Sequence, residues 1–361
     1  MIDPLKGAGG RATRGLDVRP ETAAVLRGHV EQAERNDRPA AESLAALRED
    51  GFFALIGPGR GAGARAETIA RSLVGVGRFC PSTAWVAGTC AVSKNLVVAN
   101  FPERAVLEVL ADPDVLGCGS GVPAGRGERE PDGVRLRGRW PNVSGCEDAA
   151  WAVLALMLDG AFSLAVVPVS DLAVERTWSM AGMRATGSHT LVAEDVLVPA
   201  DRVTSAGGFA VADRLLYAMT VLGPVVGAAR GALDAIEAMF ASDRVPFMSS
   251  YSRMGESPGA RLWLAEAAHL VDRAEDTMLT VAAAVDAGDV ADGPRMLMRA
   301  ADSARDCRAA VERMLDLHGA SGFATTNVLQ RFWRDVSVGS RHPQVNPYLA
   351  AEGLGAALAP V

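Results

Sequence analysis

Two short stretches of the chain carry side chains whose types and spacing could support chemistry. In residues 138–151, GRWPNVSGCEDAAW, the large aromatic residue Trp140 is followed by the hydroxyl of Ser144 at a bend. In SRHPQVNP, His342 offers an imidazole, which suits acid–base work because its pKa lies near neutral pH. The residues alone leave a second interpretation open for each. Trp140 and Ser144 could be core and turn residues of a β-domain, and His342 could lie in a surface loop.

The other histidines and the cysteines form no metal-binding pattern. The five cysteines are scattered without a CxxC pair and without a histidine at ligand spacing, so we expect reduced thiols and no structural zinc. His29, His269 and His318 lie in helical patterns and are expected to be structural or solvated.

Charge and hydropathy narrow the function classes. A formal net charge of −7 argues against a general nucleic-acid binder and against a surface anchored to acidic lipid. The longest apolar run, AAWAVLALML, is closed by Asp159 and Gly160 and is too short to span a bilayer. Residues 1–20 lack the apolar core of a signal peptide and are expected to form a flexible lead-in. We therefore expect a cytoplasmic protein without nucleic-acid or membrane partners.

The elements that must position these residues change character twice along the 361-residue chain. Residues 21–112 are predicted to be helical, as in ESLAALREDGFF, which stops at Gly51, and in PSTAWVAGTCAVSKNLVVANF, which opens with Pro81. Residues 113–206 are predicted to hold short strands, from GVRLRGRW, WAVLALML, FSLAVVPV and HTLVAEDVLVP. Residues 207–361 hold four long helical patterns, typical of an antiparallel four-helix bundle. The fold class is therefore mainly α with a central β-domain.

This order of elements, with the motifs it carries, resembles the acyl-CoA dehydrogenase fold. More closely, it resembles the two-component flavin-dependent monooxygenases of that superfamily, which include the oxygenase components of p-hydroxyphenylacetate hydroxylase, dibenzothiophene monooxygenase and the amino-sugar N-oxygenases. The resemblance covers roughly residues 21–358. Its strongest pieces are CPSTAWVAG, GRWPNVSGCEDAAW, WSMAGMRATGSHTLVAEDVLVP and FWRDVSVGSRH, in that order. It implies an N-terminal helical domain, a small β-barrel and a C-terminal four-helix bundle.

The resemblance implies four residues around a flavin ring. The Ser144 hydroxyl would lie near flavin N5 with Trp140 as a wall, and Trp85 of STAW and Ser120 of the Gly-rich loop GSGVPAG would complete it. A hydroxyl at N5 would slow the loss of peroxide from a C4a-(hydro)peroxyflavin formed with O2, and an indole would keep water out. The reduced flavin, FMNH2 or FADH2, would come from a separate reductase, because the chain has no GxGxxG fingerprint for a nicotinamide cofactor.

The resemblance also implies roles for other residues. His342 would face the flavin and take a proton from a phenol or help to activate the peroxide, and Arg244 would bind the flavin phosphate, often across a subunit interface. Ser93, His189 and Asn346 would lie on the substrate side. Many relatives have a histidine where this chain has Ser93, and an acid where it has Asn346. His342 therefore lacks an anionic partner and is expected to be a weaker base than in the phenol hydroxylases.

The expected activity is hydroxylation or N-oxygenation of a small aromatic, polycyclic or amine substrate in specialised metabolism, by a homotetramer or a dimer. One alternative is an acyl-CoA dehydrogenase-type FAD oxidoreductase, in which a glutamate such as Glu237, Glu266 or Glu275 abstracts a proton. The other is a non-redox member of the fold, either a cyclase or a binding scaffold.

Overall fold

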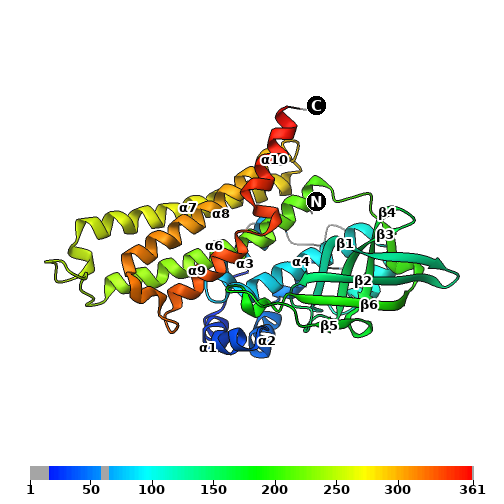
Figure 1. Cartoon of the computed structure of the whole chain (residues 1–361), viewed down its shortest axis with the longest axis horizontal. Coiled ribbons are helices and arrows are strands. Elements are labelled where there is room, and N and C mark those ends of the chain that lie inside the picture. The colour runs from blue at the N-terminus through cyan, green and yellow to red at the C-terminus, as the bar shows by residue number, and fades with distance from the viewer. Residues whose placement is uncertain (1–15, 58–64, 360–361) are drawn as a thin grey trace, which may run out of the picture.

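The computed structural model describes residues 16–57 and 65–359 and shows three parts along the molecule. The β-sheet lies toward one end, long helices extend to the other end, and the first N-terminal helices, coloured blue, lie below the region between them (Figure 1). The predicted order of helices, strands and helices is confirmed. The site described below lies where the three parts meet.

Within its described residues, the helical part contains the α-helices α1 (Pro20–Asn36), α2 (Ala41–Glu49), α3 (Ala66–Gly77), α4 (Pro81–Asn100) and α5 (Glu103–Val109). α2 stops before Gly51, whose φ of 77° is in the left-handed region, and α4 begins with Pro81 at its first turn. Residues 1–15 of the predicted flexible lead-in lie outside the described residues. Its remainder is anchored, because the Leu16 amide donates to Ser72 Oγ at 2.8 Å.

The central part is one seven-stranded sheet in the order β5-β6-β2-β1-β3-β4-β7. Its strands are β1 (Gly117–Glu130), β2 (Gly133–Val143), β3 (Trp151–Leu158), β4 (Ala161–Pro168), β5 (Ala173–Glu175), β6 (His189–Val198) and β7 (Val203–Ser205). β1 pairs in parallel with β3, and the other pairs are antiparallel. The four strands predicted from periodicity are β2, β3, β4 and β6. The segment GSGVPAG, predicted to be a loop, belongs to β1 instead.

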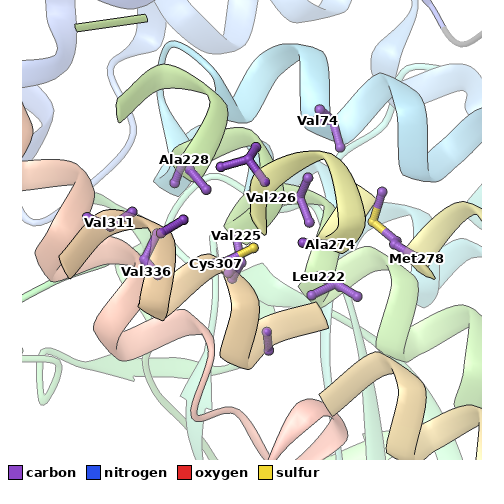
Figure 2. Packing of buried hydrophobic residues seen from close by; sticks show 14 of the residues in the cluster. Val74, Leu222, Val225, Val226, Ala228, Ala274, Met278, Cys307, Val311 and Val336 are labelled. Atoms are coloured by element: carbon purple, nitrogen blue, oxygen red, sulfur yellow. The ribbon is translucent and has the colours of Figure 1, made fainter. Parts of the chain in front are cut away.

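The bundle contains α6 (Val211–Ala241), α7 (Pro258–Ala287), α8 (Gly293–His318) and α9 (Val328–Gly339), as predicted, and α10 (Pro347–Leu358) projects from it (Figure 1). Figure 2 shows its apolar interior, where labelled side chains include Val225 of α6, Met278 of α7, Cys307 of α8 and Val336 of α9. α6 is long and apolar enough to cross a membrane, but 83% of its most apolar window is buried in the protein, as in a core helix.

The loop between β5 and β6, residues 176–188, is clamped onto α9. The Met183 amide, at a φ of 51°, donates to Asp335 Oδ1 at 2.5 Å. Gly182 packs so closely that a Cβ atom there would lie 2.1 Å from the Arg334 carbonyl oxygen. Arg334 also forms an ion pair with Glu34 of α1 at 2.8 Å. These contacts fix a wall of the site against α9, which the Arg334–Glu34 pair joins to α1.

Candidate active site

A pocket of about 520 Å³ opens between the sheet and the helices. This volume lies within the roughly 300–1,000 Å³ of typical small-molecule sites. The pocket is mostly apolar, and each part of the fold contributes to it. Its lining includes Trp85 of α4, Ser120 of β1, Ser144 of the bend after β2, Trp178 of the β5–β6 loop, Tyr217 of α6 and His342 after α9. Predicted residues from distant parts of the chain thus meet in one pocket.

Ser144 and Trp85 meet in this pocket. The bend turns sharply because Asn142 and Gly145 have φ values of 60° and 70°, which brings the Ser144 hydroxyl into the wall. Trp85 Nε1 donates to Ser144 Oγ at 3.1 Å. The Ser144 side chain is buried, with a relative exposure of 6%, yet it lines the pocket. The structure therefore presents a fixed hydroxyl beside an indole.

The Ser144 hydroxyl continues into a chain of hydroxyl groups. Ser144 Oγ lies 2.7 Å from Ser188 Oγ, which lies 2.6 Å from Thr186 Oγ1. Thr186 Oγ1 donates to the Met183 carbonyl at 2.8 Å, and Trp178 Nε1 donates to the same carbonyl at 3.0 Å. The hydrogen bonds thus connect the pocket wall to the clamp on α9.

His342 lies in the turn after α9 and lines the same pocket. Its ring is 5.5 Å, centroid to centroid, from both Trp85 and Tyr217. The Gln344 amide donates to His342 Nδ1 at 3.3 Å, which favours the neutral tautomer with its proton on Nε2. Burial by its neighbours lowers the pKa of His342 to about 4. At neutral pH the imidazole is uncharged and can donate from Nε2.

Among the residues that the structure describes, the pocket lining contains no carboxylate. Of the bundle glutamates considered as proton-abstracting bases, Glu266 pairs with Arg313 and Glu275 pairs with Arg230, and neither lines the pocket; Glu237 does not line it either. An acyl-CoA dehydrogenase needs such a base beside its substrate, so the site does not favour that alternative.

Trp140 does not lie where the sequence predicted it. Its indole is fully buried in the core of the sheet, and Nε1 donates to the Ala155 carbonyl at 2.7 Å. The ring packs over Gly125 and Gly138, where a Cβ atom would lie within 2.2 and 2.7 Å of its carbons. Side chains on a strand alternate between its faces, and Trp140 faces inward. The prediction of a flavin wall is corrected to a core residue.

Two substrate-side predictions also need correction. His189 is buried behind the wall, where Nδ1 accepts from the Trp178 amide at 3.2 Å and Nε2 lies 3.5 Å from Glu147. Its neighbour Ser188 faces the pocket instead, as alternation along an extended segment requires. Asn346 is the N-cap of α10, and its Oδ1 accepts from the Tyr348 amide at 2.9 Å.

The remaining predicted residues are divided between the pocket and other places. Ser120 lines the pocket. Ser93 lines a neighbouring cavity of about 40 Å³, which shares Ser120 and Tyr217 with the pocket, and its Oγ donates to a carbonyl of its own helix. Arg244 lies after α6, where it donates to the His318 carbonyl at 2.6 Å, and it does not line the pocket of this chain.

Sequence reasoning missed several lining residues, notably Trp178, Thr186, Ser188 and Tyr217. The two hydroxyl residues lie in RATGSHT, and alternation before β6 could have distinguished Ser188 from His189. Tyr217 lies on a helix that is apolar all round, so periodicity gave no signal that it faces a pocket.

The three-part arrangement, with a pocket where the parts meet, is that of the acyl-CoA dehydrogenase fold. Residues 219–347 match the family model described as acyl-CoA dehydrogenase, C-terminal domain. The chain is 33% identical over 365 residues to the FADH(2)-dependent resorcinol hydroxylase, oxygenase component, of Rhizobium sp. (strain MTP-10005), covering 90% of this chain and 88% of that protein. It is 30% identical over 363 residues to the flavin-dependent monooxygenase, oxygenase subunit HsaA, of Rhodococcus jostii (strain RHA1), covering 90% and 92%. The chain belongs to the two-component flavin-dependent monooxygenases, as an oxygenase component.

Solved structures agree with this assignment. XiaF from Streptomyces sp., in complex with FADH2 and glycerol, superposes with a TM-score of 0.86 at 29% identity, covering 94% of this chain and 93% of that one. The 3-HSA hydroxylase from Rhodococcus sp. RHA1 has a TM-score of 0.82 at 28% identity, covering 94% and 96%. The predicted fold class, the reduced-flavin cofactor and the monooxygenase activity are confirmed.

Proposed function

We propose that the protein hydroxylates a neutral aromatic compound that carries a hydroxyl group, bound beside a reduced flavin in the 520 Å³ pocket. One observation supports this most strongly. Among the described residues, the pocket has aromatic and apolar walls, no carboxylate, and a neutral His342 beside the Tyr217 ring; its one cation, Arg341, donates to the Ser337 carbonyl. An uncharged, ring-shaped substrate with a single polar handle suits such a lining.

The residues of the pocket fit a flavin ring. Trp85 and Trp178 supply flat apolar surface, and the Ser144 hydroxyl has a lone pair that no described residue fills. When bound, reduced flavin would react with O2 and deliver one oxygen atom to the substrate, as cofactors supply such chemistry. The apolar lining would keep water away from that reaction.

His342, which lies beside Trp85, and Tyr217, which lies beside His342, would orient the substrate. His342 would donate from Nε2 to the substrate oxygen. Burial raises the pKa of Tyr217, so its hydroxyl remains a donor at neutral pH. Two donors directed at one oxygen would hold the aromatic ring in a fixed orientation. This arrangement also supports a phenol over an amine, because a protonated amine would find no anionic partner among the described residues of the lining.

Membership of a two-component system implies a separate flavin reductase and a small-molecule substrate. The finer expectations are part of the proposal. The chain would act in the cytoplasm as a homotetramer, with a dimer as the other assembly considered. Arg244 would reach the flavin phosphate of a neighbouring subunit, and its position outside the pocket of its own chain is compatible with that role.

The test mixes the protein, with anaerobically reduced FMN or FAD, with oxygenated buffer in a stopped-flow instrument. We expect a long-lived absorbance phase distinct from reduced and oxidised flavin. In the presence of a suitable phenol, hydroxylated product should form at the expense of hydrogen peroxide. Ser144→Ala should shorten that phase by about fivefold, as the loss of one hydrogen bond would.

Trp140→Phe is the matched control, because Trp140 lies in the sheet core and outside the pocket lining. It should keep the wild-type partition between product and peroxide. Direct conversion to oxidised flavin and peroxide with both flavins and a panel of phenols, or efficient turnover of amines alone, would contradict the proposed substrate class.

A further inference from the structure

The hydrogen-bond chain that starts at Ser144 has a fixed direction. One end is Trp85 Nε1, which can only donate, and the other is the Met183 carbonyl, which can only accept. Ser144, Ser188 and Thr186 lie between them, and each hydroxyl has one proton. Every contact is satisfied in one arrangement only. Thr186 donates to Met183, Ser188 donates to Thr186, and Ser144 donates to Ser188.

In this arrangement the Ser144 hydroxyl donates its proton to Ser188 and not to a ligand in the pocket. One lone pair of its oxygen accepts from Trp85, so the group it can offer to a ligand is the remaining lone pair. Ser144, Ser188 and Thr186 are each at most 6% exposed. Water therefore has little access to their hydroxyl groups and cannot easily replace the protein partners that fix the direction of the hydrogen bonds.

The acceptor end is held firmly. The Met183 carbonyl accepts from Thr186 Oγ1, from Trp178 Nε1 and, at 3.2 Å, from the Thr186 amide. The Met183 amide is bound by the buried Asp335 of α9. Reversal would require Thr186 to leave this carbonyl and donate to Ser188, at the cost of about one net hydrogen bond.

We propose that Ser188 and Thr186 are positioning residues that turn a hydroxyl lone pair of Ser144, rather than its proton, toward the pocket, so that the site discriminates for a ligand with an N–H donor at that position. The inference rests on the proposed function. A reduced flavin carries a proton on N5, whereas an oxidised flavin has a lone pair there. The site therefore favours reduced flavin, because oxidised flavin gains a hydrogen bond at N5 only if the chain reverses.

The test measures dissociation constants of oxidised and anaerobically reduced FMN and FAD for the full-length protein, and the ratio of oxidised to reduced values. The reduction potential of the bound flavin reports the same ratio independently. Thr186→Val keeps the shape of the side chain but removes its hydroxyl. Ser188 then loses its acceptor and can donate to Ser144, whose proton is freed toward the pocket. We expect the ratio to fall by about fivefold, equivalent to one hydrogen bond.

Three variants sharpen the test. Thr186→Ser keeps the hydroxyl and should keep the wild-type ratio. Thr190→Val is a control outside the chain, because Thr190 pairs with Thr177 in the same region at 2.8 Å, and it should also leave the ratio unchanged. Ser188→Ala removes the acceptor of Ser144 directly, and it should lower the ratio even if Thr186→Val does not fold.

The outcomes distinguish a failure of this inference from a failure of the proposed function. If wild-type protein binds reduced flavin and hydroxylates phenols, but Thr186→Val and Ser188→Ala keep the wild-type ratio, the inference is overturned and the proposed function stands. A ratio that falls equally in Thr190→Val also overturns it. If the wild-type protein binds neither redox state, both fail.

Discussion

Replacing Asp335 by asparagine should remove a pH dependence from the docking of the β5–β6 loop on α9. Burial raises the pKa of Asp335 from its ordinary value of 3.8 to about 6, although the Met183 amide works against this rise. The docked loop therefore binds a proton on Asp335 more tightly than an open loop, in which the carboxylate is solvated. Docking should be stabilised as the pH falls through about 6 toward 4.

The size of the effect follows from the two pKa values. Between pH 7.5 and pH 5, Asp335 in the docked loop becomes mostly protonated, whereas a solvated aspartate stays mostly ionised. Linkage then gives the docked state about 1 to 2 kcal/mol, roughly a tenfold rise in the protection factor of the loop amides. Asparagine keeps an oxygen acceptor for the Met183 amide but does not titrate in this range.

The assay is native-state hydrogen exchange of the peptide that contains Met183, corrected for intrinsic rates, at both pH values. His189 lies beside this loop, and its lowered pKa acts in the opposite direction, because its protonation in acid favours the open loop. Its contribution is present in both proteins and cancels in the ratio of wild type to Asp335→Asn. The charged neighbours Glu34, Arg331 and Arg334 cancel in the same way. If that ratio does not rise on acidification, the raised pKa of Asp335 is refuted.

Three further predictions concern single sites. Trp140→Phe removes the indole N–H that donates to the buried Ala155 carbonyl, so the free energy of unfolding measured by urea titration should fall by about 1–3 kcal/mol. Flavin affinity should not change. Weakened flavin binding would instead support the flavin-wall role first predicted for Trp140. Gly182→Ala should undock the loop, because its Cβ would collide with the Arg334 carbonyl, and exchange across residues 178–188 should show lost protection. The pKa of His342 near 4 predicts a hydroxylation rate that is flat through neutral pH and falls only in acid near pH 4; a limb near 6.5 would contradict its burial.

Much of the fold could be predicted because many of its helices and strands have recognisable local sequence signals. The helices α2 and α4 have clear end signals, and β2, β3, β4 and β6 follow alternation or apolar runs. β1 was missed because it is rich in glycine and charge, which is unusual for a strand. Glycine is required at position 125 because the Trp140 ring of the neighbouring strand β2 occupies the space where a Cβ atom would lie. This requirement for glycine depends on a tertiary contact between two strands, which cannot be inferred from the local sequence of either strand.

The site could be predicted for those residues whose motifs resemble the family and whose side chains line the pocket in the structure. Ser144, Trp85, Ser120 and His342 do share one pocket. Asn346 did carry a local signal, because an asparagine before a proline is typical of an N-cap followed by the first helical residue. That signal competed with the substrate-side role that the resemblance implied, and the cap describes the contacts of Asn346 better.

The lack of a carboxylate among the described lining residues and the tautomer of His342 lead to the same view of the chemistry. A histidine paired with a carboxylate is held as a base, whereas His342 has an apolar environment, a pKa near 4, and an Nδ1 already accepting from Gln344. Such an imidazole is a poor acceptor of a proton but a competent donor from Nε2. A substrate oriented by donation keeps its own proton, so its ring must be electron-rich without becoming a phenolate. The residues of this pocket therefore favour rings with strongly donating substituents, and His342→Gln, which keeps an N–H donor, should preserve more activity than His342→Ala.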